Sequence, residues 1–361
     1  MSHACVCGQP FHGEWMVSSL NNGEWLERIY RLIGDPGGLC STADLPRSQF
    51  YCRLAEQPDH LVPRWYVSRL DKLAIPDELV LSPTTFFTHE NSSRPELERS
   101  LPLLTNFALS GNVAWVTDPA TNALQPFWLE PEVASELQHV TPGDQVHLPI
   151  TPSLKVLAAA GILVPRNYMH DISCRWNHVI SYAADGFRAK QYVPVAGLIH
   201  PFHLSALRRY YRHQIRSGLI RLGDEQSSRR YVAHNEAVAR FFHHQLTGVV
   251  SRIVGEAVKP SYVYLASYQA GAILAKHTDR DQCEFSISLC LDYCPEPERA
   301  TSWPLHLQTP EGTTTVYQAI GDALLYRGGL LPHYRDQLRE GHSSTSIFFH
   351  YVGQDFAGPL D

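Results

Sequence analysis

The sequence predicts an α+β protein in which a C-terminal antiparallel β-sandwich or barrel with buttressing helices follows a smaller N-terminal α/β region. Three observations predict this class. After Pro260 the chain breaks into short β-rich runs with no helix between them, two amphipathic helical segments precede these runs, and a compact mixture of strands and helices comes earlier. We expect an irregular region over 1–99, a small α/β domain over 100–170 and the β-rich domain over 171–361.

The composition is that of a globular protein. Of 361 residues, 44% are hydrophobic and 18% charged, which is apolar enough to offset the entropy lost on folding. The net charge of −6 comes without a run of like charges, so we expect neither nucleic acid nor a membrane surface as a partner. The first residues lack a basic segment followed by an apolar one, and the eight Cys are scattered, which favours a cytoplasmic protein with reduced thiols.

The segment 100–170 carries readable signals for a small domain. The predicted elements are strands at 112–116 and 126–129, helices at 131–139 and 152–160, and a closing strand at 162–164. This order resembles a winged-helix unit, and its end, Leu157 to Leu163, is similar to the peptide-recognition domains of enzymes that modify ribosomal peptides. The resemblance implies that the N-terminal region binds a peptide substrate or a leader peptide.

Two helices are expected to support the β-rich domain. Residues 170–200 are interpreted as a linker because apolar and polar residues alternate in parts of it, such as 191–195. Leu204, Leu207, Tyr211 and Ile215 then recur at helical spacing, and this pattern predicts a helix over 201–217. A second helix is predicted over 236–254, where the apolar residues form one broad face.

The β-rich domain follows as a series of short runs separated by turn residues. Strands are predicted at 262–268, 284–291, 304–308, 313–319, 323–326 and 346–352. Six or more strands at this spacing favour an antiparallel sandwich or barrel. Residues capable of chemistry are concentrated in this part of the chain.

Three residues of the β-rich domain form a candidate metal site. His277 and Asp279 are two positions apart between two predicted strands, and an extended backbone places both side chains on one face. His333 follows 54 residues later, just before the last strand. Two His and one carboxylate are the facial triad that leaves adjacent positions open on Fe(II) in non-haem oxygenases.

The ordered set around these ligands resembles the iron- and 2-oxoglutarate-dependent oxygenase superfamily, in particular its prolyl-hydroxylase-like branch. The matching residues are Tyr268, Gly271, His277, Asp279, Gly321-Asp322-Ala323 and His333, and the similarity covers about residues 260–352. The resemblance implies a double-stranded β-helix with Fe(II) bound by His277, Asp279 and His333. It also implies 2-oxoglutarate and O2 as co-substrates and hydroxylation of an unactivated C–H bond as the default reaction.

The chain departs from the family where the distal carboxylate of 2-oxoglutarate is bound. The final strand, where the family usually places an Arg or Lys, has only hydroxyl residues, of which Ser344 or Ser346 could donate a hydrogen bond. Arg335, two residues beyond His333, is the best substitute, with Arg339 and Arg280 as alternatives. The competing interpretation of Arg335 is a surface ion pair with an acidic neighbour, Asp336 or Glu340.

A second departure is Leu274, which stands where prolyl hydroxylases often carry a Tyr that binds 2-oxoglutarate. Tyr264 or Tyr268 could supply the missing hydroxyl, although either is equally compatible with a half-buried strand aromatic.

The leading hypothesis is therefore a dioxygenase that hydroxylates a peptide or an amino-acid-like substrate. The same chemistry on a small natural-product scaffold is the first alternative. A β-barrel binding module without metal, in which His277 and Asp279 are incidental, is the second.

Overall fold

The computed structural model describes Pro63, Tyr66, Leu73, Ile75 and residues 78–88, 112–118, 121–147 and 152–361. These residues belong to one compact unit, which spans 41–361. Most of the region 1–99, for which an irregular structure is predicted, lies outside the described residues. No helix within the described residues is long and apolar enough to cross a membrane.

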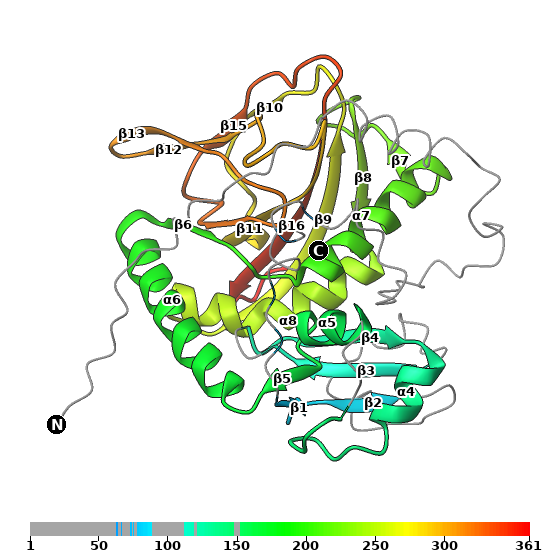
Figure 1. Cartoon of the computed structure of the whole chain (residues 1–361). Coiled ribbons are helices and arrows are strands. Elements are labelled where there is room, and N and C mark those ends of the chain that lie inside the picture. Colours follow the sequence, from blue (N-terminus) through cyan, green and yellow to red (C-terminus); the bar gives the residue numbers. More distant parts are fainter. Residues whose placement is uncertain are drawn as a thin grey trace. The chain divides into compact units, whose positions relative to one another are not determined.

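The β-rich part consists of two antiparallel sheets (Figure 1). The large sheet has the order β6-β14-β11-β16-β9-β8-β7, and the small sheet has the order β10-β15-β12-β13. The bounds of the strands are β6 Tyr192–Val195, β7 Arg221–Leu222, β8 Arg230–His234, β9 Val258–Tyr268, β10 Leu274–His277, β11 Phe285–Cys294, β12 Leu305–Thr309, β13 Gly312–Val316, β14 Ala323–Tyr326, β15 His333–Arg335 and β16 Ser343–Gly353.

From β9 to β16 the chain alternates between the two sheets. Strands β9, β11, β14 and β16 lie in the large sheet, whereas β10, the β12–β13 hairpin and β15 lie in the small one. This winding of one chain through two facing sheets is the double-stranded β-helix, or jelly roll. The prediction of an α+β chain with such a C-terminal domain is thereby confirmed, and the sheet pairings leave β6, β7 and β8 as additions at the edges of the large sheet.

The two faces of the large sheet have different surroundings. On β11, Ile287 and Leu289 belong to the same hydrophobic core as the helices, whereas Cys290 belongs to a separate cluster inside the barrel. Ser286 and Ser288 alternate with these apolar residues and have no exposed surface. Because successive side chains of a strand point to opposite faces, Ser286 and Ser288 face the interior between the sheets.

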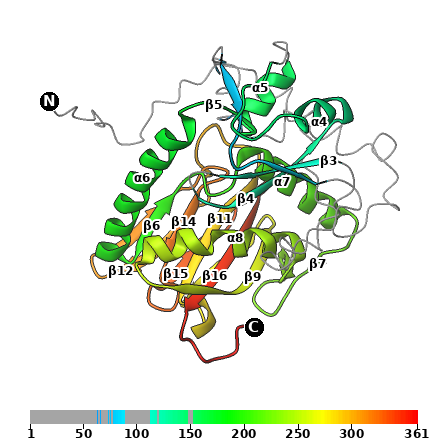
Figure 2. The same cartoon turned by 90° about the horizontal axis from the view of Figure 1, so that it is seen from below.

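Three helices cover the outer face of the large sheet, namely α6 (Tyr168–Lys190), α7 (Pro201–Arg216) and α8 (Ala237–Val254), as Figure 2 shows. The helices predicted over 201–217 and 236–254 are confirmed as α7 and α8. The interpretation of 170–200 as a linker is wrong, because α6 occupies most of it and only β6 is extended. Trp176, Ile180, Ala183 and Phe187 recur at spacings of four and three residues, so the helical period is present in the sequence.

The side chain of Glu236 connects α7 to α8. Glu236 caps α8 by accepting hydrogen bonds from the backbone N–H groups of Val238 and Ala239 at 3.0 and 3.1 Å. The same carboxylate accepts from the hydroxyls of Tyr210 and Tyr211 on α7, at 2.8 and 2.6 Å. The cap therefore also fixes how the two helices lie against each other.

The smaller region is built from two further antiparallel sheets. A three-stranded sheet has the order β2-β3-β4, and β1 pairs with β5. Its elements are β1 Leu79–Leu81, β2 Phe86–Thr88, β3 Asn112–Thr117, β4 Leu124–Leu129, α4 Pro131–Leu137, α5 Pro152–Ala159 and β5 Leu163–Pro165. All five elements predicted between 112 and 164 are present, but β5 pairs with β1, which lies in the segment 1–99. The winged-helix arrangement and the boundaries at 99 and 170 stay predictions.

The smaller region shares its core with the helices. The imidazole of His200, the N-cap of α7, accepts a hydrogen bond from the N–H of Phe202 and has its Nε2 at 2.9 Å from the carbonyl of Ala159 on α5. Gln245 on α8 accepts from the N–H of Leu124 on β4 at 2.9 Å. One continuous hydrophobic core includes residues of both parts, so the smaller region and the helices stabilise each other.

Buried charges connect α7 to the large sheet. Asp292 on β11 pairs with Arg208 at 3.0 Å and with Arg212 at 2.6 Å, and Arg208 also binds Glu296 at 2.9 Å. The side chain of Arg208 is 1% exposed, so its charge depends on these carboxylates. Burial alone would raise the pKa of Asp292, but the two guanidinium groups outweigh burial and hold the pKa well below its usual value.

Replacing Asp292 with Asn should destabilise the protein by about 3–5 kcal/mol, because the buried Arg208 would keep only Glu296 as an anionic partner among the described residues and Arg212 would lose its pair with Asp292. The measurement is the free energy of unfolding from denaturant titration. Asp185→Asn is the matched control, because its pair with Arg188 is exposed, and it should change stability by less than about 1 kcal/mol. Equal stabilities of the two variants would contradict a role for Asp292 in fixing α7 on the sheet.

Candidate metal centre

The three predicted ligands come from neighbouring parts of the small sheet. His277 is the last residue of β10 and His333 is the first residue of β15, and the two are directly paired across these antiparallel strands. Asp279 follows β10, and its N–H donates to the carbonyl of Gly328 at 2.9 Å. The pairing of the strands and this one hydrogen bond bring residues that are 54 positions apart to one point.

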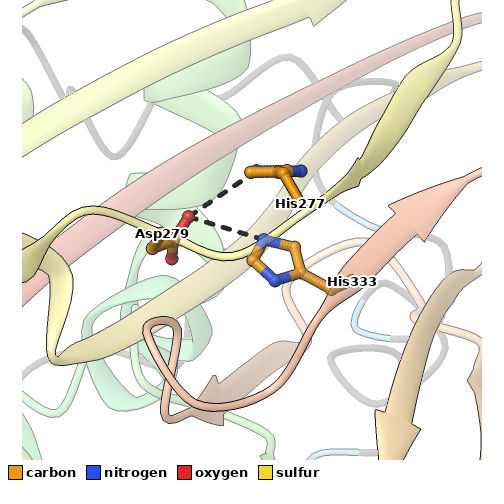
Figure 3. Close-up of side chains that lie close together, drawn as sticks. All are labelled: His277, Asp279 and His333. Atoms are coloured by element: carbon orange, nitrogen blue, oxygen red, sulfur yellow. Dashed lines mark ion pairs between the residues drawn. The ribbon is translucent and has the colours of Figure 1, made fainter.

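Figure 3 shows the carboxylate of Asp279 turned toward both imidazoles. The Oδ1 atom of Asp279 lies 3.7 Å from Nε2 of His277 and 3.5 Å from Nε2 of His333, and the ring centroids are 4.4 Å apart. One ligand atom from each residue lies within 4.8 Å of the other two. The sequence prediction that these side chains converge is therefore consistent with the structure.

Backbone carbonyls fix the tautomer of both imidazoles. Nδ1 of His277 lies 2.8 Å from the carbonyl of Ala275, and Nδ1 of His333 lies 3.0 Å from the carbonyl of Leu331. Because a carbonyl only accepts, each Nδ1 carries the hydrogen, which leaves the lone pair of each neutral imidazole on Nε2. Both lone pairs are thus available on the atoms that face Asp279, as a metal ion requires.

The protonation states also suit a cation. Burial, followed by the neighbouring His333, lowers the pKa of His277 below its usual value. Burial alone would raise the pKa of Asp279, but His333 and the Ser286 hydroxyl outweigh burial and lower the pKa to about 2. The centre therefore presents an anionic carboxylate, and in His277 an imidazole whose neutral form is favoured.

The geometry fits a six-coordinate divalent ion. Bonds of about 2.0–2.2 Å place adjacent ligand atoms about 3 Å apart around such an ion, slightly closer than the separations of 3.5 and 3.7 Å found here. The side chain of His277 is 32% exposed, whereas those of Asp279 and His333 are 12% and 3% exposed. Solvent, and with it a substrate, can therefore approach the centre on the His277 side.

A second group of potential ligands consists of Asp279, Cys283 and His350. Burial, followed by the charge of Asp279, raises the pKa of Cys283 to about 12, so the thiol is protonated in the metal-free protein. Nδ1 of His350 lies 2.8 Å from the hydroxyl of Ser286. Within the part of the chain that the structure describes, the group with His277 and His333 is the better metal site.

Arg335 is a buried cation. It is 4% exposed, and it donates hydrogen bonds to the carbonyl of Trp303 and to Oε1 of Gln318. It forms no ion pair with a described residue, and its Nε has no hydrogen-bond partner among them. The alternative of a surface ion pair with Asp336 or Glu340 is therefore not observed. Burial lowers the pKa of Arg335, the direction expected for a cation that lacks an anionic partner.

Tyr268 and Ser344 lie near Arg335. Ser344 is 4% exposed and is paired directly with Tyr268 on β9, so both side chains are on the same face of the sheet. Tyr268 packs edge-on against Trp303 at 5.0 Å, and Arg335 lies over that same indole at 4.9 Å. The hydroxyl of Tyr268 accepts a hydrogen bond from Arg230 at 3.2 Å. These residues thus form one cluster of mixed polar and aromatic groups inside the barrel.

The remaining predicted residues do not join this cluster in the same way. The hydroxyl of Tyr264 donates to Asp224 at 2.6 Å and is therefore occupied. Arg339 and Arg280 are both exposed. Ser346 is buried on β16, two positions from Ser344.

Sequence reasoning missed Gly328 and Ser286. A Cβ added at Gly328 would lie 2.0 Å from Oδ2 of Asp279, so only glycine leaves room for the carboxylate. The Gly328-Gly329 pair shortly before His333 was a visible signal for such a close approach. The hydroxyl of Ser286 donates to Oδ2 of Asp279 at 2.8 Å, and its signal was the alternation of serine with apolar residues at the start of β11.

No family model and no curated protein matches this chain. Solved structures with a similar fold include the non-heme alpha-ketoglutarate-dependent epimerase SnoN from nogalamycin biosynthesis, at 14% identity and a TM-score of 0.41 over 49% of this chain and 84% of that one. A Pseudomonas putida prolyl-4-hydroxylase matches at 18% identity and a TM-score of 0.40, over 48% of this chain and 99% of that one. HygX from Streptomyces hygroscopicus, with nickel and 2-oxoglutarate bound, matches at 12% identity and a TM-score of 0.39, over 48% of this chain and 87% of that one. These similarities are too distant to assign a function to this chain.

Replacing Gly328 with Ala should weaken divalent metal binding by about tenfold or more, because the new methyl group would displace the carboxylate of Asp279. The dissociation constant for Mn(II) is the measurement. Gly329→Ala is the matched control. A Cβ added at Gly329 would have the carbonyl oxygen of Asp279 as its nearest neighbour, at 3.9 Å, which is an ordinary contact. This variant should bind Mn(II) as the unmodified protein does. Equal affinities of both variants would show that Gly328 does not position the ligand.

Proposed function

We propose that this protein is a non-haem Fe(II)- and 2-oxoglutarate-dependent dioxygenase that hydroxylates an unactivated C–H bond. The observation that carries the proposal is the convergence of two Nε2 lone pairs and one carboxylate oxygen within a double-stranded β-helix. Such a triad leaves three adjacent positions of a six-coordinate ion open. When bound, the iron would supply the activation of O2 against the 2-oxo acid.

Each residue of the centre has a defined part in this proposal. His277, Asp279 and His333 hold the metal, and the carbonyls of Ala275 and Leu331 keep both imidazoles in the required tautomer. The overall reaction converts 2-oxoglutarate, O2 and R–H into succinate, CO2 and R–OH, with one oxygen atom entering each organic product. The exposed side of His277 is the direction from which R–H would reach the metal.

We propose that Arg335 binds the distal carboxylate of 2-oxoglutarate. A buried guanidinium without an anionic partner is costly, and a carboxylate bound from solution would neutralise it. Arg335 lies two residues beyond His333 on β15, so both side chains face the same way. Tyr268 and Ser344 provide hydroxyls in the same cluster, while Tyr264 and Arg339 do not belong to this subsite.

The substrate class belongs to the proposal as well. A peptide or an amino-acid-like substrate is favoured by the sequence resemblance of 100–170 to peptide-recognition domains, and a leader peptide would bind in the same region. A small natural-product scaffold is the alternative. Because the smaller region shares its core with α7 and α8, removing it would expose that core, and the full chain is the proper material for a test.

The substrate class can be tested with 2-oxoglutarate, Fe(II) and the full chain. Peptides and small scaffold molecules would be compared by how far each one stimulates succinate formation, and mass spectrometry would look for a gain of one oxygen atom. Stimulation by peptides alone would support the first class. Stimulation by small scaffolds alone would exclude it in favour of the alternative.

Replacing His277 or Asp279 with Ala should abolish iron-dependent succinate formation, because two ligands do not define the three open positions. His306→Ala is the control, since His306 pairs with Asp336 at 3.3 Å and is not part of the triad. Unchanged turnover in the His277 and Asp279 variants would refute the assignment of these residues as ligands. Iron-free protein after anaerobic purification with Fe(II) would favour the metal-free binding module.

Arg335→Gln should raise the KM for 2-oxoglutarate by about 10–100-fold, which corresponds to the loss of one charged hydrogen-bonded pair of about 1.5–3 kcal/mol. The same variant should not change the KM for 2-oxopentanoate, which lacks the distal carboxylate. Arg339→Gln is the control and should behave as the unmodified protein with both acids, because Arg339 is exposed. An equal effect of Arg335→Gln on both acids would argue against recognition of the distal carboxylate.

A further inference from the structure

The two oxygen atoms of Asp279 have different surroundings. Oδ1 faces Nε2 of both His277 and His333, at 3.7 and 3.5 Å. Oδ2 accepts a hydrogen bond from Ser286 at 2.8 Å and lies against the backbone of Gly328. Only one oxygen of the carboxylate is therefore directed at the metal position.

Ser286 is itself held in place. It has no exposed surface, and its hydroxyl lies 2.8 Å from Oδ2 of Asp279, 2.8 Å from Nδ1 of His350 and 3.4 Å from the carbonyl of Cys283. A hydroxyl has one hydrogen to donate, and the carboxylate is the charged acceptor among the three groups. Nδ1 of His350 must then donate to the hydroxyl oxygen.

The tautomer of His350 completes the chain. Because the Ser286 hydroxyl gives its hydrogen to Asp279, Nδ1 of His350 carries a hydrogen that it donates to the hydroxyl oxygen. The chain thus runs from His350 through Ser286 to Asp279. All three side chains are supplied by the barrel itself, two of them by the adjacent strands β11 and β16, where Ser286 and His350 are directly paired.

We propose that Ser286 and His350 are positioning residues that keep Asp279 monodentate, so that the metal retains three open positions. The count of positions explains why this matters. Two imidazoles and one carboxylate oxygen occupy three of six positions, a bidentate 2-oxo acid takes two, and O2 takes one. A second carboxylate oxygen would remove a position that the reaction needs. This inference rests on the proposed function, because only a metal that binds both a 2-oxo acid and O2 needs Asp279 to leave three positions open.

The test uses Mn(II) as a probe that supports no turnover. Its affinity is measured by titration, and its coordinated waters are counted from the broadening of its electron paramagnetic resonance lines in water enriched in oxygen-17. The unmodified protein should hold three waters on Mn(II), since three protein atoms occupy the other positions. Ser286→Ala should bind Mn(II) about 10–100-fold more weakly and hold two waters.

Ser288→Ala is the matched control. Ser288 lies two residues further along β11, has no exposed surface, and its hydroxyl has no hydrogen-bond partner among the described residues. It should keep the affinity and the three waters of the unmodified protein. His350→Asn, whose amide N–H can replace that of Nδ1, should also retain them, whereas His350→Leu should follow Ser286→Ala.

Three outcomes count against the inference. Ser286→Ala with unchanged affinity and three waters would overturn it, and so would weaker binding with all three waters kept, because the carboxylate would then remain monodentate without Ser286. If His350→Leu behaved as the unmodified protein, the positioning role proposed for His350 would be refuted. Failure of the unmodified protein to bind Mn(II) at all would overturn the proposed function together with this inference.

Discussion

The centre depends on keeping an ionised carboxylate in a largely buried position. Asp279 is only 12% exposed, and isolated burial would favour its protonated form. Its surroundings compensate by a hydroxyl on one oxygen and two imidazoles near the other. The same carboxylate also requires a glycine at position 328, because only a residue without a Cβ lets the backbone pass this close to it. The hydrogen bond from Ser286 on the large sheet to Asp279 after β10 also connects the two sheets.

A second buried charge of opposite sign lies on the same strand as one of the imidazoles. Arg335 is held by a carbonyl and an amide, both neutral, so its charge is solvated but not neutralised. In the proposed function, a ligand with a metal-binding end and a carboxylate end would reach both the metal centre and this cation. Arg335 would then add recognition of the charge at the far end of the ligand to the chemistry of its reacting end.

Much of the C-terminal part could be predicted because its signals are local. Short β-rich runs between turn residues predicted β9, β11 and β16, and helical spacing predicted α7 and α8. The ligands were identified from their types and order. Gly328 and the role of Ser286 could not be predicted, because their importance depends on a contact across strands that only the folded chain creates. The short strands β10 and β15 were missed for a similar reason, since strands of four and three residues carry little pattern of their own. Helix α6 was missed although its spacing was present, because the extended residues 191–195 were taken to represent the whole segment.

The edges of the large sheet affect whether copies of the protein can associate by strand pairing. One edge is the four-residue strand β6, which carries Pro194 with its side chain exposed, and the other is β7, which has two exposed residues. A proline offers no N–H to a neighbouring strand, and two residues offer too short a ladder for stable pairing. The sheet thus ends in borders that discourage another polypeptide from extending it, which protects a barrel rich in β-structure from linear self-association.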